Sequence, residues 1–347
     1  MATSYTTGTY QFDLDAFFPR RLFEHITEIR VDAPEIILRQ AQTRKRRSKL
    51  TIDGKLTILA ADHPARGVVS SGSDPLGMGN RHQYLGRIVR VLAASTFDGV
   101  MGTPDVIDDL LIVDYLVQQG GGTSFLDDKV LIACMQRGGI AGAQGELHDR
   151  FTAYTAESAA RSRLDGGKML LRFTPDDERA LMTLYECAQA INDLNRQEMP
   201  AFVEPLRAYL VDGKWVTRNS AEELIKLVGI ASAIGDSSRN LWLKLPYCES
   251  YEQVAMATTL PIILLGGPSK EDPQSTFQDF AAGMAAGANV RGAMVGRNVI
   301  FPGVDDPAAV AQALDDIIHQ GASVDDAVAR TIAHRDHQLR VLADCIP

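Results

Sequence analysis

The sequence predicts a closed (β/α)8 barrel, the TIM-barrel form of the α/β class. Eight short apolar runs alternate with helical patterns over about 270 residues, which is the unit count of that fold. Most of the runs are continuously apolar, as expected for parallel strands buried on both faces. A doubly wound open sheet would normally carry a GxGxxG turn after its first strand, and Asp62-His-Pro-Ala-Arg-Gly67 is not such a turn.

The elements follow one another in a regular order. The first strand is the run Lys-Leu-Thr-Ile-Leu-Ala-Ala61, and a Gly/Ser-rich loop and a helix come after it. The predicted strands are 55–61, 99–101, 129–135, 168–173, 201–206, 241–245, 261–265 and 292–295. The helices that follow them are predicted at 81–94, 106–118, from about 155, 176–196, 221–234, 251–258, 275–286 and 307–319.

The chain before the first strand is predicted to be an N-terminal helical extension, residues 1–52. Residues 53–347 then form one barrel domain that includes the C-terminal helices, because no linker or shift in composition divides them. The extension ends in the basic run Arg44-Lys-Arg-Arg47. In an acidic chain we interpret this run as a solvated helix end or an intersubunit contact rather than a nucleic-acid site.

Bulk composition excludes several classes of protein. The 347 residues carry a net charge of -9 and are 45% hydrophobic, which is unlike a nucleic-acid binder and typical of a globular protein. No apolar run is long enough to span a bilayer. The four cysteines lack CxxC spacing and the seven histidines form no HxH or HxxxH pair. We therefore expect a cytoplasmic protein without membrane or nucleic-acid partners, and we predict neither a metal nor a cofactor.

Lys244 stands inside the apolar run Asn240-Leu-Trp-Leu-Lys-Leu-Pro-Tyr247. Burying an ammonium ion is costly, so such a lysine loses its proton or finds a partner. A neutral amine beside a cleft is a nucleophile that forms a Schiff base with carbonyl compounds. The alternative is a lysine whose stem is buried and whose charged end reaches water.

Other polar residues fall where the strands end, which is where the active site of a (β/α)8 barrel lies. Lys168 on the fourth strand would lower the pKa of Lys244 by like-charge repulsion. Glu204 on the fifth strand is placed to shuttle protons, and Asp62 after the first strand to bind or deprotonate a substrate hydroxyl. We predict these four as the catalytic residues.

Glycines and arginines after other strands predict an anion site. Bare backbone N–H groups after the seventh and eighth strands are the usual phosphate site of this fold. The predicted substrate-binding residues are Gly266, Gly267, Gly296, Arg297, His63, Arg137 and Arg172. Arg66, Arg137 and Arg172 would suit a carboxylate on the substrate, but they would equally pair with aspartate or glutamate.

The C-terminal third resembles a known family in three consecutive motifs. These are Lys-Leu-Pro-Tyr247, then Leu-Pro-Ile-Ile-Leu-Leu-Gly-Gly267, then Gly-Ala-Asn-Val-Arg-Gly-Ala-Met-Val-Gly-Arg-Asn298. Ala61-Asp62-His63, Lys168-Met-Leu-Leu171 and Phe202-Val-Glu-Pro-Leu206 add to the resemblance. They are similar to the class I, Schiff-base aldolases of the DhnA and tagatose-bisphosphate aldolase type within the DeoC/LacD group. The resemblance covers about residues 53–320.

The resemblance implies an imine on Lys244, proton transfer by Glu204 and Lys168, and hydroxyl contacts by Asp62. It also implies that Gly266, Gly267, Gly296 and Arg297 hold a phosphate. Two departures stand out: His63-Pro64 replaces the more usual His-Gly, and the archaeal branch has an aromatic pair where this chain has Glu204 and Leu206.

The end of the first strand and the loop after it, Ala-Ala-Asp-His-Pro-Ala-Arg-Gly67, are similar to actinobacterial barrel proteins that are labelled as aldolases and linked to sugar or inositol breakdown. That likeness implies a phosphorylated keto sugar or keto sugar acid as substrate, of the 2-deoxy-5-keto-gluconate 6-phosphate type, and a homo-oligomer. Two rival functions are a metal-dependent barrel lyase or isomerase, and a catalytically inactive ligand-binding barrel.

Overall fold

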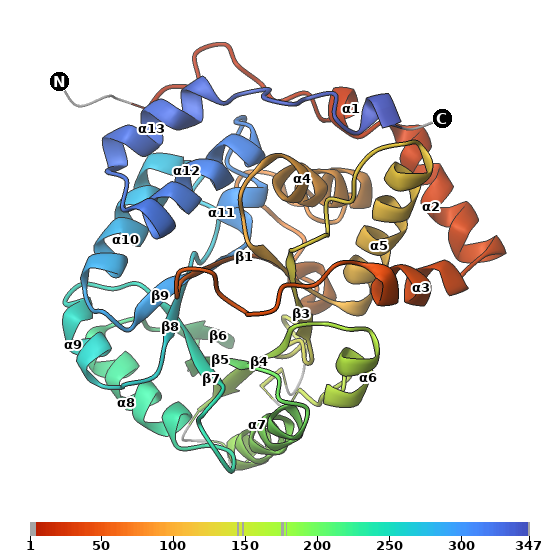
Figure 1. The fold of residues 1–347 in the computed structure, drawn as a ribbon. Coiled ribbons are helices and arrows are strands. Elements are labelled where there is room, and N and C mark those ends of the chain that lie inside the picture. The colour runs from red at the N-terminus through yellow and green to blue at the C-terminus, as the bar shows by residue number, and fades with distance from the viewer. Residues whose placement is uncertain (1–4, 144–145, 148, 175–176, 178, 346–347) are drawn as a thin grey trace.

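The computed structural model describes residues 5–143, 146–147, 149–174, 177 and 179–345, and they form a closed parallel barrel (Figure 1). Its strands are β1 (Leu56–Ala61), β2 (Gly99–Gly102), β3 (Val130–Cys134), β4 (Gly166–Phe173), β5 (Ala201–Val211), β7 (Leu241–Pro246), β8 (Ile262–Leu265) and β9 (Val290–Val295). Neighbours pair in parallel around the ring, and the β4–β5 pairing closes it. The predicted (β/α)8 fold is confirmed.

Helices form an outer ring around the strands (Figure 1). They are α4 (Arg81–Ala94), α5 (Pro104–Gln119), α6 (Ala156–Arg161), α7 (Arg179–Arg196), α8 (Ala221–Ser232), α9 (Tyr251–Met256), α10 (Pro273–Ala285) and α12 (Pro307–Gln320). Polar N-caps fix several starts, as where the Asn80 side chain accepts from the Gln83 backbone N–H. The predicted start of α7 at Asp176 lies outside the described residues. α13 (Val324–Ala333) and η2 (Ala343–Cys345) lie in the predicted C-terminal helical region, whereas η1 (His63–Arg66) and α11 (Arg297–Ile300) were not predicted.

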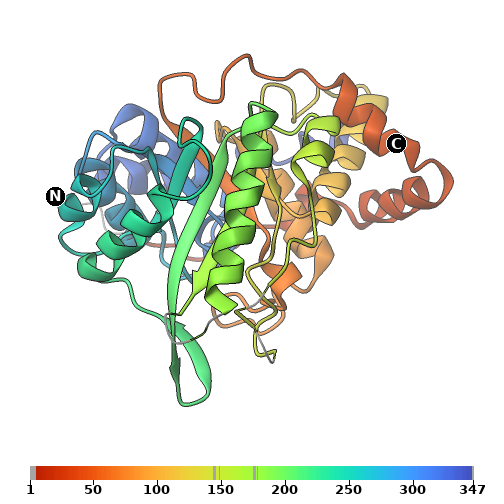
Figure 2. The same ribbon diagram turned by 90° about the horizontal axis from the view of Figure 1, so that it is seen from below.

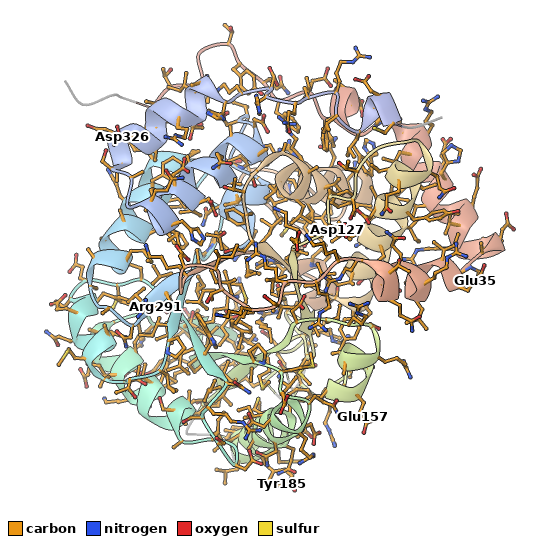
Figure 3. The ribbon with its side chains drawn as sticks, in the orientation of Figure 1. Glu35, Asp127, Glu157, Tyr185, Arg291 and Asp326 are labelled. Carbon is orange, nitrogen blue, oxygen red and sulfur yellow. The ribbon has the colours of Figure 1, made fainter. Side chains whose placement is uncertain are left out.

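Side chains crowd the interior of the barrel (Figure 3), and strand register decides which ones lie there. Alternate residues of each strand point inward, and the inward apolar set is Leu56, Ile58, Ala60, Met101, Val130, Ile132, Cys134, Phe202, Ile263 and Met294. Lys168 pairs in register with the inward Phe202, and Lys244 with the inward Ile263. Glu204 lies two residues after Phe202 on the same face. All three charged side chains therefore point into the barrel above an apolar layer.

A hairpin extends the fifth strand beyond its predicted end at residue 206. β5 continues to Val211 and turns through Asp212 and Gly213, whose φ angles are 49° and 75°. The chain then returns as β6 (Lys214–Thr217), antiparallel to β5. Positive φ at both central residues is the geometry of a two-residue hairpin turn. The hairpin projects from the body of the barrel (Figure 2).

The N-terminal extension covers one side and one end of the barrel. It begins with α1 (Leu14–Phe17), α2 (Arg20–Asp32) and α3 (Glu35–Thr43), and α2 and α3 pack against α5. The segment between α3 and β1 then crosses the near end of the barrel in Figure 1. We call this end, where the strands begin, the floor, and the opposite end the mouth.

The basic run in this segment corrects one prediction. Arg44 is not a solvated helix end: its side chain is fully buried and its Nη2 lies 2.8 Å from Asp165 Oδ2. Arg47 Nη1 lies 2.5 Å from Asp98 Oδ1, and the exposed Lys45 pairs with Asp128. Asp165 precedes β4, Asp98 precedes β2 and Asp128 precedes β3. The basic run therefore holds the extension against the floor through ion pairs within one chain.

None of the helices in the described part of the chain has the length and apolar character needed to cross a membrane.

Candidate active site

The strand ends bring the four predicted catalytic residues into one chain of contacts. Lys168 Nζ lies 2.9 Å from Asp62 Oδ2 and 2.9 Å from Glu204 Oε2. Lys244 Nζ donates to the same Glu204 oxygen at 2.8 Å. All four side chains are buried. Because β1, β4, β5 and β7 are different strands, only closure of the barrel makes them neighbours.

The two lysines differ in their electrostatic surroundings. Burial disfavours the charged form of both. At Lys168 the flanking carboxylates of Asp62 and Glu204 outweigh burial and raise the pKa above the usual lysine value. At Lys244 burial, helped by the charge of Lys168, outweighs the single contact with Glu204 and lowers the pKa. The ammonium form is therefore favoured at Lys168, and the neutral amine is more accessible at Lys244.

The two carboxylates are held ionised by the same lysines. Burial alone would raise the pKa of Glu204, but Lys168 and Lys244 together lower it to about 2. The pKa of Asp62 also lies far below its usual value, because Lys168, His63 and Lys244 outweigh its burial. Glu204 can thus accept a proton from an attacking amine while Lys168 keeps its charge.

A cavity of about 290 Å³ opens at the mouth above Lys244 and Glu204. Its walls include Gly266, Gly267, Gly296, Arg297 and His63, which are five of the predicted substrate-binding residues. Lys168 and Asp62 are not among the described residues that line the cavity. They lie deeper in the barrel than Lys244 and Glu204. The hairpin contributes Thr217, the segment after it contributes Asn219, and η1 contributes Arg66.

The glycines after β8 and β9 form a tightly packed edge of this cavity. A Cβ on Gly296 would lie 2.6 Å from the Ala60 carbonyl oxygen, and one on Gly266 would lie 2.7 Å from Val295 Cγ2. Gly267 has φ +65° and open space beside it, which leaves its backbone accessible. Only glycine allows the chain to pass here and still present bare backbone to a ligand.

Asn298 fixes the position of the loop after β8. Its Nδ2 donates to the Gly266 carbonyl at 2.5 Å, and its Oδ1 accepts from the Lys270 backbone N–H at 2.9 Å. The sequence motif contained Asn298, but its side-chain role depends on two loops meeting and was not predicted. Asn298 is a positioning residue for the glycine pair.

His63 and Arg297 follow the ends of β1 and β9 and line the same cavity. Burial lowers the pKa of His63 to about 4, so its imidazole is neutral near pH 7. Its ring lies 2.8 Å from the position of a Cβ on Gly296, the residue before Arg297. Burial also lowers the pKa of Arg297, whose Nε is buried without a hydrogen-bond acceptor in the described part of the chain.

Two predicted substrate-binding residues lie elsewhere. Arg172 Nη1 pairs with Glu146 at 2.5 Å and donates to the Gly138 carbonyl at 3.2 Å. Arg137 Nη2 lies 3.7 Å from Asp149 Oδ1. Neither arginine is among the described residues that line the cavity. Both arginines therefore pair with acidic side chains, which was the alternative to binding a substrate carboxylate.

The rival metal-dependent mechanism would need several ligands in one place. No group of three or more His, Cys, Asp or Glu side chains within the described ranges is positioned to hold a metal ion. The contacts of Asp62 and Glu204 run to lysines, which compete with a cation for carboxylate oxygens.

Comparisons with known proteins extend this description. Residues 54–316 match the family described as Cgl0159-like. The crystal structure of Cgl0159 from Corynebacterium glutamicum (Brevibacterium flavum) is similar with a TM-score of 0.80 and 35% identity, covering 87% of this chain and 98% of that one.

Aldolases share the fold at lower identity. A fructose-bisphosphate aldolase from Slackia heliotrinireducens has a TM-score of 0.61 at 14% identity, covering 94% of this chain and 97% of that one. A Schiff base forming fructose-1,6-bisphosphate aldolase has a TM-score of 0.56 at 19% identity, covering 82% and 99%. An uncharacterized aldolase of Saccharolobus solfataricus is 29% identical over 145 residues, 39% of this chain. The chain spans about half the length of that relative, 47%.

Proposed function

The chain belongs to the Cgl0159-like family, and we propose that it is a class I aldolase. It makes or breaks a carbon–carbon bond of a phosphorylated keto sugar or keto sugar acid through an imine on Lys244. One observation carries the proposal: of the two buried lysines in the barrel, Lys244 has the lowered pKa and lines the cavity. The fold shared with aldolases and the partial match to an archaeal aldolase support it.

The proposed reaction begins with attack of the Lys244 amine on the substrate ketone carbon. The new C–N bond forms as the carbonyl π bond breaks, and the oxygen takes a proton from solvent, giving the hydroxyl of a carbinolamine whose nitrogen still carries the extra proton. Glu204, which lies 2.8 Å from Lys244 Nζ, accepts a proton from the nitrogen and returns it to the hydroxyl, which leaves as water. The product is a protonated imine, which withdraws electrons from the neighbouring carbons.

Cleavage uses that imine as an electron sink. A base takes the proton from the hydroxyl next to the breaking bond, and those electrons form the aldehyde carbonyl. The electron pair of the breaking carbon–carbon bond moves into the imine and leaves an enamine on Lys244. Glu204 is the ionised carboxylate that lines the cavity at this point.

Lys168 and Asp62 do not line the cavity, and they are proposed to act through their contacts with Glu204 and with each other. The ammonium of Lys168 lowers the pKa of Lys244 and keeps Glu204 ionised. Asp62 holds Lys168 in its charged form through the 2.9 Å contact. The predicted contact of Asp62 with substrate hydroxyls stays a proposal. Only 5% of the Asp62 residue is exposed.

The glycine loops and Arg297 are proposed to bind the substrate phosphate. The open backbone at Gly267 offers a hydrogen-bond donor, and Arg297 offers a charged fork whose Nε has no acceptor among the described residues. A phosphorylated ketose or keto sugar acid of the 2-deoxy-5-keto-gluconate 6-phosphate type, from inositol or carbohydrate breakdown, fits this combination of lysine and anion site.

The proposal is tested by incubating the protein with dihydroxyacetone phosphate and borohydride, then measuring the intact mass. Imine chemistry predicts a stable adduct that forms equally well after treatment with a chelator, because it needs no metal. Lys244→Met serves as the unreactive control. Absence of an adduct with several ketose phosphates, together with chelator-sensitive turnover, would overturn the aldolase assignment in favour of a metal-dependent lyase.

A further inference from the structure

We propose that Arg66 completes the anion site by sharing one phosphate dianion with Arg297. The inference rests on the proposed function in one respect, namely that the ligand is a phosphate ester. It adds a specificity-determining residue from the loop after β1 to a site otherwise built by the loops after β8 and β9.

The fold places the two arginines on adjacent strand ends. β1 pairs with β9, with Leu59 opposite Val295, so the two strands finish side by side. Arg297 is the second residue after β9, and Arg66 ends η1, which begins directly after Asp62. Both side chains line the same cavity. The close packing of Gly296 on Ala60 and His63 holds the two loops together at this point.

Neither guanidinium has a carboxylate partner in the described ranges. The Nε atoms of Arg66 and Arg297 are both buried there without a hydrogen-bond acceptor. Arg137 and Arg172 provide the contrast, because each of them lies within 4 Å of an acidic side chain. Buried donors without acceptors destabilise a protein unless a ligand supplies the acceptor.

The two charges are close enough to repel each other. The positive charge of Arg66 contributes to the lowered pKa of Arg297, after burial. Two like charges that converge on one cavity are unfavourable in the empty protein and favourable around an anion with two negative charges. A phosphate dianion accepts from both forks and neutralises both charges, whereas a single carboxylate would leave one positive charge unbalanced.

Titration calorimetry with inorganic phosphate at pH 8 tests the inference on the full-length protein. The variants are Arg66→Gln and Arg297→Gln, with Lys214→Gln as a control that removes an exposed positive charge from the hairpin. We expect one phosphate per chain in the wild type and at least about tenfold weaker binding in each arginine variant, from the loss of a charge-assisted hydrogen bond. Lys214→Gln should bind as the wild type does.

A structural role for Arg66 is tested by the melting temperature of the ligand-free protein, which should not fall in Arg66→Gln because the substitution removes a charge that Arg297 repels. Two independent phosphate sites, or an Arg66→Gln variant within twofold of wild-type affinity, would overturn the inference. This result differs from failure of the proposed function. A protein that binds phosphate through both arginines but forms no imine would retain the inference and lose the aldolase assignment.

Discussion

At the floor of the barrel, the charged side chains of the basic run bind separate carboxylate oxygens, whereas at the mouth two lysines share one carboxylate oxygen. Arg44 pairs with Asp165 and Arg47 with Asp98 at the floor. At the mouth Lys168 and Lys244 converge on one oxygen of Glu204. Buried charge is thus common to both ends, but the two lysines that share one carboxylate oxygen lie at the end where barrel enzymes carry out chemistry.

Two lysines sharpen the comparison. Burial lowers the pKa of Lys129 at the floor to about 8, so a lowered pKa by itself does not identify a nucleophile. Lys129 Nζ donates to the backbone carbonyls of Ser95 and Phe97 at 3.2 Å and 2.5 Å. Lys244 instead faces the cavity. A functional lysine combines a lowered pKa with access to a substrate.

The largest expected effect is the loss of turnover in Lys244→Met. Removal of the nucleophile should lower kcat by at least about 10⁴-fold, in the range measured for other covalent catalysts. Lys129→Met is the matched control, because it removes a lysine of lowered pKa from the other end of the barrel. Steady-state assays of both variants, with circular dichroism to confirm folding, measure the difference. Equal activity in the two variants would contradict the distinction between the ends.

The next effect concerns the floor. Asp165→Asn leaves the buried Arg44 guanidinium without its carboxylate, which should lower the free energy of unfolding by roughly 3 kcal/mol. Denaturant titration measures this loss. The kcat of the folded variant should be that of the wild type, because the substitution lies at the opposite end from Lys244. A large fall in kcat with unchanged stability would show that the floor takes part in catalysis.

A smaller effect is a shift of the pH profile in Lys168→Gln. Only the neutral amine of Lys244 attacks, so kcat/KM falls as the pH drops below the Lys244 pKa. Lys168 contributes to the lowering of that pKa, so its removal raises the Lys244 pKa and moves the acidic limb to higher pH. A profile measured from pH 5 to 10 gives the shift. Movement of the limb to lower pH would show that Lys168 is not the group that repels the proton.

The smallest effect is on stability at the floor as a function of pH. Burial opposes charging of His319, but hydrogen bonds to Asp98 and Asp53 prevail and raise its pKa to about 9. A raised pKa stabilises the fold fully below the unfolded value of about 6.5, and this contribution is lost as the pH rises to 9. Melting curves of His319→Gln should therefore lack the decline that the wild type shows between these values. An identical decline in both proteins would assign it to another group.

Much of the mouth could be predicted from the sequence, because a parallel barrel collects its strand ends at one edge. Lys168, Glu204 and Lys244 each lie on an apolar run with a clear strand period, so their meeting follows from the fold. The hairpin could also have been predicted, because Asp212-Gly213 between two β-rich stretches is typical of a two-residue hairpin turn.

The floor could not be predicted in the same way. The partners of Arg44 and Arg47 lie 121 and 51 positions away in the chain, and no local pattern links them (165 − 44 and 98 − 47). The same limit applies to Arg137 and Arg172, whose acidic partners come from the loop after β3. Side-chain pairing between loops depends on tertiary geometry rather than on periodicity.

The most direct test of the central claim is to find which lysine the substrate labels. The protein is treated with dihydroxyacetone phosphate and borohydride and digested, and the modified peptide is sequenced by mass spectrometry. The proposed mechanism predicts the label on Lys244, with Lys168 and Lys129 unmodified. A label on Lys168 would contradict it, because the lysine held between two carboxylates would then be the nucleophile.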